Sequence, residues 1–243
     1  MSWPAGYGLK EFDEIDSTNE EARRMASRGE TGPVWIVTRR QTAGRGRRGR
    51  QWIAPEGNLS ATLLLAPGRP ASQCAQLSFA AALAASDALF VSGAENKVKW
   101  PNDVLVDGRK IAGILLESAS QGTADPPWLA IGIGINLKHF PADTEFPATS
   151  LAAAGLVAPE PMQVLERLAG ALAKWYDVWR TTGFPPVREA WLARAAGLGS
   201  RMRARLANGE ILGVFEGIDD SGALLLRETQ DRLRVISAGE VFF

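Results

Sequence analysis

The chain has 243 residues, of which 46% are hydrophobic and 22% charged, and its 27 basic side chains balance 27 acidic ones. These values are ordinary for a soluble globular protein of one or two domains, large enough to bury a core without disulfides or metals. Zero net charge argues against a protein whose main task is to coat nucleic acid, and a single cysteine, Cys74, excludes an intramolecular disulfide.

The N-terminus lacks the basic start and the continuous apolar core of a signal peptide. The longest apolar stretch, residues 77–91, is interrupted by polar side chains and is too short to cross a bilayer. We therefore expect a cytoplasmic protein that makes no contact with a membrane.

The first half of the chain predicts alternating helices and strands. The segment Ser-Thr-Asn-Glu-Glu that begins at Ser17 predicts a helix start, capped by Ser17 or Thr18, and a helix that runs to about Arg28. Residues 34–38 and 59–65 are β-branched, aromatic or apolar, and both predict strands. Residues 71–90 are rich in alanine and leucine and predict one long, buried helix, with Cys74 in the core.

The rest of the chain predicts further strands, two helices and, at the end, a region of short, closely spaced strands. Strands are expected at four places, residues 98–100, 104–106, 111–117 and 129–136, with a hairpin loop at residues 122–127. Helices are expected at residues 161–182 and 186–195, so the class is α+β, with helices on one side of a mainly antiparallel sheet. Short strands and turns after residue 201 predict a small β-barrel. We therefore expect two domains, residues 1–196 and 197–243.

Residues 41–52, Q-T-A-G-R-G-R-R-G-R-Q-W, form a strongly cationic stretch that we call the Gly/Arg segment. Six arginines lie between Arg39 and Arg50 with no acid among them. The glycines fit a dinucleotide fingerprint, but no apolar helix follows, and Arg50 and Gln51 stand where a P-loop needs Lys and Ser/Thr. The segment predicts a loop that is poorly ordered when empty and binds a polyphosphate. A solvated surface loop or a nucleic-acid contact explains this segment equally well.

Two further segments point toward a ligand. Lys110 follows the turn K-W-P-N-D at 99–103 and begins an apolar strand, so its ammonium is placed to stabilise charge on a phosphate. A simple turn with an edge-strand lysine explains this segment as well. In I-G-I-G-I-N, residues 131–136, the glycines weaken a strand, and their usual reason is the close approach of a ligand or another backbone. Asn136 ends this strand and is a candidate hydrogen-bonding group.

The order of these phrases resembles one known family. S-T-N, Q-T-A-G-R-G-R-R-G-R-Q-W, K-W-P-N-D, R-K-I-A-G-I-L-L-E and I-G-I-G-I-N occur in the order found in biotin protein ligases. The closing I-S-A-G-E-V-F-F is similar to the end of that family's C-terminal domain. The resemblance covers nearly the whole chain. It implies a class II synthetase/biotin ligase-like fold with a small C-terminal SH3-like barrel.

The resemblance also implies a site and a reaction. The implied biotin-binding residues are Ser17, Thr18, Asn19, Gln41, Arg45, Gly46, Arg47, Lys110, Gly113, Gly132 and Gly134. The implied ATP-binding residues are Arg47, Arg48, Arg50, Trp52, Lys99, Asn102, Asp103, Lys110 and Asn136. The implied catalytic residues are Lys110, Arg47 and Asp103. Biotin and ATP, with Mg²⁺, would give biotinyl-5′-adenylate, which then acylates a lysine on the biotin carboxyl carrier domain of a carboxylase.

Two departures and three alternatives accompany this hypothesis. The family often has an aromatic residue where this chain has Ser60, and the short stretch before Ser17 leaves no room for a helix-turn-helix domain, so we expect no DNA binding. A homodimer is compatible with the sequence. The nearest alternative is a lipoate–protein ligase. A nucleic-acid-binding module is disfavoured by zero net charge, and a hydrolase is disfavoured because the only histidine, His139, has no nucleophile motif beside it and is expected at the surface.

Overall fold

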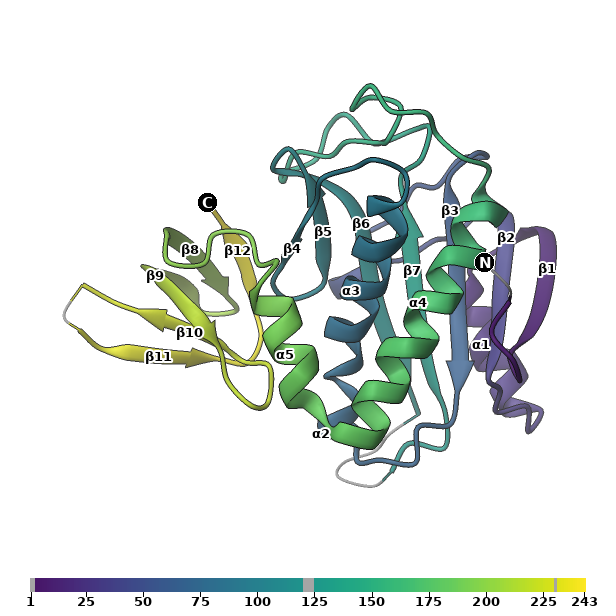
Figure 1. Cartoon of the computed structure of the whole chain (residues 1–243), viewed down its shortest axis with the longest axis horizontal. Helices are drawn as coiled ribbons and strands as arrows, with labels where there is room; N and C mark the ends of the chain where they lie inside the picture. The colour runs from purple at the N-terminus through teal and green to yellow at the C-terminus, as the bar shows by residue number, and fades with distance from the viewer. Residues whose placement is uncertain (1–2, 120–124, 230) are drawn as a thin grey trace.

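A computed structural model describes residues 3–119, 125–229 and 231–243, and its centre is a seven-stranded sheet, here called the main sheet (Figure 1). The strand order is β1-β2-β3-β7-β6-β5-β4, with only the β1–β2 pair parallel. The strands are β1 (Gly8–Ile15), β2 (Val34–Gln41), β3 (Leu59–Leu65), β4 (Lys97–Lys99), β5 (Asp103–Val106), β6 (Arg109–Ser118) and β7 (Leu129–Ile135). This confirms the predicted α+β class with a mainly antiparallel sheet.

Helices cover both faces of the main sheet, so the expectation of helices on one side is wrong. The short helix α2 (Ala71–Cys74) leads into α3 (Leu77–Phe90), which packs with α4 (Pro161–Thr182) and α5 (Phe184–Leu192) over one face and forms the larger hydrophobic core. Helix α1 (Thr18–Ser27) lies on the opposite face, where Ala22 and Met25 form a smaller core with strands β2, β3 and β7 (Figure 1).

The alternation I-G-I-G-I in β7 separates the two faces of the main sheet. Ile131, Ile133 and Ile135 point into the larger core, because side chains of a strand alternate between faces. Gly132 and Gly134 therefore lie on the face that α1 covers, here called the α1 face. The neighbouring strands also carry small or polar residues on this face, namely Ser60, Thr62 and Gly113, which pair with the two glycines. The α1 face is therefore hollow beside the first turn of α1.

A second, smaller sheet closes the chain. The C-terminal sheet has the strand order β11-β10-β9-β8-β12, all antiparallel, so β11 and β12 are its edges in the described pairing. Its strands are β8 (Arg201–Leu206), β9 (Gly209–Ile218), β10 (Leu224–Arg227), β11 (Leu233–Ile236) and β12 (Glu240–Phe242). Phe215 belongs to the larger core, and Trp100 Nε1 donates to the Gly222 carbonyl at 3.0 Å, so the two sheets share one apolar interior.

Three local details differ from the predictions. The helix expected at 71–90 is interrupted between α2 and α3, and Cys74 at the end of α2 is buried, with burial raising its pKa to about 11. Strand β1 was not predicted, because its charged sequence G-L-K-E-F-D-E-I shows no apolar alternation. Of the loop expected at 122–127, residues 122–124 lie outside the described part. Among the described residues no helix is long and apolar enough to span a membrane.

Candidate active site

A cavity of about 430 Å³ opens on the α1 face of the main sheet. It lies between the first turn of α1, the glycines of β6 and β7, the Gly/Arg segment and strand β12 of the C-terminal sheet. Every site residue implied by the sequence resemblance lines this cavity except Arg48, which is exposed. Those that do line it are Ser17, Thr18, Asn19, Gln41, Arg45, Gly46, Arg47, Arg50, Trp52, Lys99, Asn102, Asp103, Lys110, Gly113, Gly132, Gly134 and Asn136.

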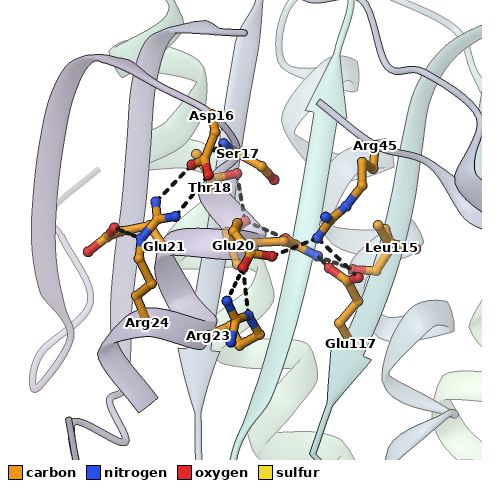
Figure 2. A network of polar contacts seen from close by, with 12 residues as sticks. Asp16, Ser17, Thr18, Glu20, Glu21, Arg23, Arg24, Arg45, Leu115 and Glu117 are labelled. Atoms are coloured by element: carbon orange, nitrogen blue, oxygen red, sulfur yellow. Dashed lines mark hydrogen bonds and ion pairs between the residues drawn. The ribbon is translucent and has the colours of Figure 1, made fainter. Parts of the chain in front are cut away.

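The first turn of α1 is fixed from both sides. Asp16 accepts two hydrogen bonds from Arg24, at 2.8 Å each, and one from the Ser17 amide at 2.7 Å (Figure 2). The hydrogen bonds from Arg24 lower the pKa of Asp16 to about 2. Ser17 is the N-cap residue, as predicted, but its side chain makes no capping hydrogen bond. Its hydroxyl therefore stays available to the cavity.

Gln41 connects the helix start to the sheet. Its side-chain oxygen accepts a hydrogen bond from the Thr18 amide at 2.9 Å, and its Nε2 donates to the Ser60 hydroxyl at 3.3 Å. Ser60 is buried and takes part in the polar wall of the cavity. An aromatic ring at position 60 would remove this hydrogen bond. Ser60, which stands where the family often has an aromatic residue, is therefore a hydrogen-bond partner of Gln41.

Asn19 lies directly over Gly132. A Cβ atom on Gly132 would come within 2.3 Å of Asn19 Oδ1, so this glycine makes room for a side chain of the protein itself. Asn19 Nδ2 donates to Glu117 at 2.7 Å, and the Thr62 hydroxyl lies 2.6 Å from Asn19 Oδ1. The Asn19 amide, which also donates to the Leu115 carbonyl at 3.4 Å, is thus held in one orientation by partners that the sequence did not indicate.

Trp52 forms an apolar wall of the cavity. A Cβ atom on Gly134 would lie 2.3 Å from the Trp52 ring, and one on Gly113 would lie 3.3 Å from it. The indole therefore rests on the two glycines, and its buried Nε1 has no hydrogen-bond partner among the described residues. Trp52 was expected with the ATP-binding residues, but it lies against glycines that were expected to contact biotin.

A charged triad closes the other end of the cavity. Lys110 Nζ lies 2.6 Å from Asp103 Oδ1, and Lys99 Nζ lies 3.6 Å from Asp103 Oδ2. Lys99 is buried above the Phe146 ring, 3.9 Å from its centroid, and burial lowers its pKa. Two ammonium groups thus share one carboxylate, which leaves a net positive charge facing the cavity.

Two asparagines complete this end. Asn102 Nδ2 donates to the Ile114 carbonyl, and the Ile114 amide donates back to the Asn102 carbonyl at 3.0 Å. Asn136 Nδ2 donates to the Thr149 carbonyl at 3.0 Å, whereas its Oδ1 is buried with no hydrogen-bond partner in the described structure. A buried acceptor without a partner is unfavourable, so Asn136 Oδ1 is suited to accept a hydrogen bond from a ligand.

The Gly/Arg segment folds into a tight hairpin across the mouth of the cavity. Arg45 and Gln51 form a β-bridge, and the Gly46 amide donates to the Arg50 carbonyl at 2.7 Å. At the tip, Arg48 has a φ of 58° and Gly49 a φ of 71°. This left-handed pair produces the sharp reversal, and glycine tolerates it without cost.

Five of the six arginines between positions 39 and 50 are paired with carboxylates from elsewhere in the chain. Arg39 pairs with Asp13, and Arg40 pairs with Glu14. Arg45 pairs with Glu20 at 3.0 Å and with Glu117 at 3.6 Å (Figure 2). Glu240 pairs with Arg50 at 2.8 Å and with Arg48 at 3.9 Å. Arg47 is half-buried in the cavity wall and has no carboxylate within 4.0 Å in the described residues. Burial lowers its pKa. The unbalanced cation of the segment is therefore Arg47.

Glu240 brings the C-terminal sheet into the site. Its carboxylate pairs with Arg50 and with Arg205 of β8, and its side chain is 16% exposed. Burial opposes its ionisation, but the hydrogen bonds from Arg205 and Arg50 outweigh burial and lower the pKa of Glu240 to about 2. Because the folded pKa lies below the ordinary glutamate value, this carboxylate stabilises the fold above about pH 4.5, and the contribution is lost as the pH falls toward 2.

Several site residues were not found from the sequence. Thr62, Phe146 and Arg205 sit in segments without a distinctive phrase, and their roles depend on contacts with distant parts of the chain. Glu117 ends the phrase R-K-I-A-G-I-L-L-E, but its contact with Asn19 was not predicted. Glu240 lies in the closing phrase I-S-A-G-E-V-F-F, which was noted only as a resemblance. His139 is exposed, as expected, and lies outside the cavity.

Two family models and several known proteins match this chain. Residues 11–136 match the biotin/lipoate A/B protein ligase family, and residues 197–243 match the biotin protein ligase C-terminal domain. A biotin–[acetyl-CoA-carboxylase] ligase of Paracoccus denitrificans is 48% identical over 94% of this chain and 97% of its own. A bifunctional ligase/repressor of Bacillus spizizenii is 36% identical over 97% of this chain and 74% of its own.

A solved structure gives the same result. The biotin protein ligase from Aquifex aeolicus, in complex with biotin and ATP, superposes with a TM-score of 0.82 at 27% identity and covers 97% of both chains. All the site residues implied by the sequence fall between residues 11 and 136, within the first family match. The chain belongs to the biotin/lipoate A/B protein ligase family and groups there with the biotin protein ligases.

Proposed function

We propose that the chain is an ATP-dependent biotin protein ligase, which forms biotinyl-5′-adenylate and transfers biotin to a lysine of a biotin carboxyl carrier domain. The observation that carries this proposal is the division of one cavity into two chemically different ends. One end offers neutral hydrogen-bonding groups and an indole wall, and the other offers cations. A polar ring on an aliphatic acid suits the first end, and a polyphosphate suits the second.

The neutral end is the proposed biotin site. Ser17, Thr18, Asn19 and Gln41 surround it with donors and acceptors for a ureido ring, and the Asn19 orientation is fixed by Glu117. Trp52, which rests on Gly113 and Gly134, lines the path of an aliphatic chain toward Lys110, whose ammonium lies 5.7 Å from the Trp52 ring centroid. Arg45 and Gly46 close the mouth. The biotin carboxylate would thus meet Lys110 at the boundary between the two ends.

The cationic end is the proposed nucleotide site. Arg47, Lys99 and Lys110 supply positive charge, and Asn102, Asp103 and Asn136 supply polar contacts. A biotin carboxylate oxygen attacks the α-phosphorus of ATP, the new P–O bond forms, and the bond to the β-phosphate oxygen breaks to release pyrophosphate. Both reactants are anions, so Lys110 and Arg47 reduce their repulsion and stabilise the charge that develops on the α-phosphate.

Mg²⁺ is proposed to enter with the nucleotide. The described residues contain no cluster of three or more metal-ligating side chains. Mg²⁺ is commonly held by one or two carboxylates together with substrate phosphates and water. Asp103 and Asp143 are the cavity carboxylates that would hold it, since Glu240 and Glu145 pair with arginines. Asp143 has no ion pair among the described residues, whereas Asp103 is shared with Lys99 and Lys110. The ion would neutralise phosphate charge in the first step.

The second step needs no covalent bond to the enzyme. The carrier lysine, as a free amine, attacks the acyl carbon of the mixed anhydride, the carbon–oxygen bond to AMP breaks, and the amine releases a proton. The hairpin of the Gly/Arg segment across the mouth is suited to keep water from the adenylate before transfer.

We further propose two domains, residues 1–196 and 197–243, that act on one site in the cytoplasm. DNA binding is not part of the proposal, because five of the six clustered arginines are already neutralised by carboxylates. Homodimer formation is compatible with the exposed edge strand β1, and sedimentation of the purified protein measures it.

A lipoate–protein ligase is the alternative within the same family. The hydrogen-bonding groups around the neutral end favour biotin, because the dithiolane ring of lipoate has no hydrogen-bond donor to match them. Incubation with ATP, Mg²⁺, an apo carrier domain and either acid, followed by mass spectrometry of the carrier, tests the choice. We expect modification with biotin and none with lipoate. Modification with lipoate alone would replace the proposal by its alternative.

A further inference from the structure

We propose that Glu240 is a positioning residue, which holds Arg48 and Arg50 from the C-terminal sheet so that Arg47 reaches the nucleotide end of the cavity. This inference rests on the proposed function and names the part that the C-terminal sheet plays in it. It also makes Arg50 an anchor of the Gly/Arg segment, whereas the sequence resemblance implied a direct contact with ATP.

The anchor is built into a chain of ion pairs. Both oxygens of Glu240 lie within 2.9 Å of Arg50 Nη2, and the Arg48 guanidinium is 3.9 Å away. Arg205, opposite Glu240 on the neighbouring strand β8, binds the same carboxylate and also Glu145. Glu240 is therefore held from its own sheet by Arg205 while it holds the hairpin tip.

Arg47 lies between the two anchored arginines and the Arg45 pair. Arg45 is fixed to Glu20 and Glu117 at the α1 end of the cavity (Figure 2), and Arg50 is fixed to Glu240 at the other end. Both sides of the short turn Arg47–Gly49 are thus tied down. A turn held at both ends leaves its one unpaired arginine little freedom, which lowers the entropic cost of binding an anion there.

A different role for the same contacts makes the opposite prediction. If Glu240 only withheld Arg50 from the phosphates, the variant Glu240→Gln would release a cation and lower the KM for ATP. If Glu240 positions the segment, the same variant raises that KM, and Arg50→Gln has the same effect. The effects of the two substitutions are then less than additive in the double variant, because each single variant already loses the Glu240–Arg50 pair.

The kinetic experiment compares the wild type, Glu240→Gln, Arg50→Gln and the double variant in biotin-dependent exchange of pyrophosphate into ATP. We expect the KM for ATP to rise about tenfold in all three variants, while the KM for biotin changes less than twofold. Glu210→Gln is the matched control, since Glu210 pairs with Arg203 in the same sheet and lies outside the cavity. An unchanged or lower KM for ATP in Glu240→Gln overturns the proposal, as does an additive double variant.

A second readout does not depend on activity. Limited digestion of the ligand-free proteins with trypsin, mapped by mass spectrometry, measures cutting after Arg47 and Arg48. We expect Glu240→Gln to be cut there about fivefold faster than the wild type, and Glu210→Gln to match the wild type. If Glu240→Gln and the wild type are cut at the same rate, the positioning role of Glu240 is wrong, whatever the kinetic experiment shows. Absence of wild-type exchange would instead reject the proposed function, with the anchor still judged by digestion.

Discussion

Replacing Lys110 by alanine is expected to lower kcat/KM for biotin adenylation about 100- to 1,000-fold, the usual effect of losing one group that stabilises transition-state charge. Lys110 is the ammonium at the boundary between the two ends of the cavity, 2.6 Å from Asp103. Its removal leaves Asp103 with Lys99 alone and cancels the net positive charge that faces two reacting anions. Pyrophosphate exchange at saturating and limiting ATP measures the effect.

The control for this variant is Lys138→Ala. Lys138 pairs at the surface with Glu160, 3.2 Å away, and lies outside the cavity. We expect Lys138→Ala to keep wild-type activity and both variants to keep the wild-type circular dichroism spectrum. A folded Lys110→Ala protein that retains more than a third of the wild-type kcat/KM contradicts the role assigned to this lysine.

Replacing Gly132 by alanine is expected to weaken biotin binding about 100-fold or more. The new Cβ would lie 2.3 Å from Asn19 Oδ1, and the Asn19 amide cannot move without losing Glu117 and Thr62. A displaced Asn19 removes a polar contact from the proposed ureido site and leaves buried groups without partners. Isothermal titration with biotin measures the affinity, and we expect the unfolding free energy to fall by about 1–3 kcal/mol from overpacking.

Gly170 offers the matched glycine control. It lies inside α4, where an added Cβ would meet nothing within 4 Å. Gly170→Ala is expected to leave biotin affinity unchanged and to raise stability by up to about 1 kcal/mol, because alanine is the better helix former. Wild-type biotin affinity in Gly132→Ala would contradict the placement of the biotin ring beside Asn19.

Most of the fold and many site residues could be predicted from short, strongly patterned segments. The run I-G-I-G-I-N predicted both a strand and a surface that approaches a ligand, and β7 confirms the strand. The predicted helix start at Ser17 and the predicted strands around Lys110 are also confirmed. These elements could be predicted because periodicity and capping preferences act over a few residues. Strand β1 could not be predicted from the sequence, because an exposed edge strand needs no alternation of apolar and polar residues.

The remaining parts of the site depend on distant contacts. Glu117 reaches Asn19 and Arg45 only because β6 and β7 pair in one register beneath α1. Glu240 neutralises Arg50 across 190 positions of sequence, so the Gly/Arg segment looked more strongly cationic in the sequence than it is in the structure. Charge counted along a chain does not include partners that folding brings from elsewhere.

Biotin-dependent exchange of labelled pyrophosphate into ATP, measured with the wild-type protein and Mg²⁺, tests the central claim most directly. We expect exchange that requires biotin, that lipoate does not support, and that Lys110→Ala nearly abolishes. A folded protein that binds ATP but shows no biotin-dependent exchange would contradict the assignment of the cavity on the α1 face to biotin adenylation.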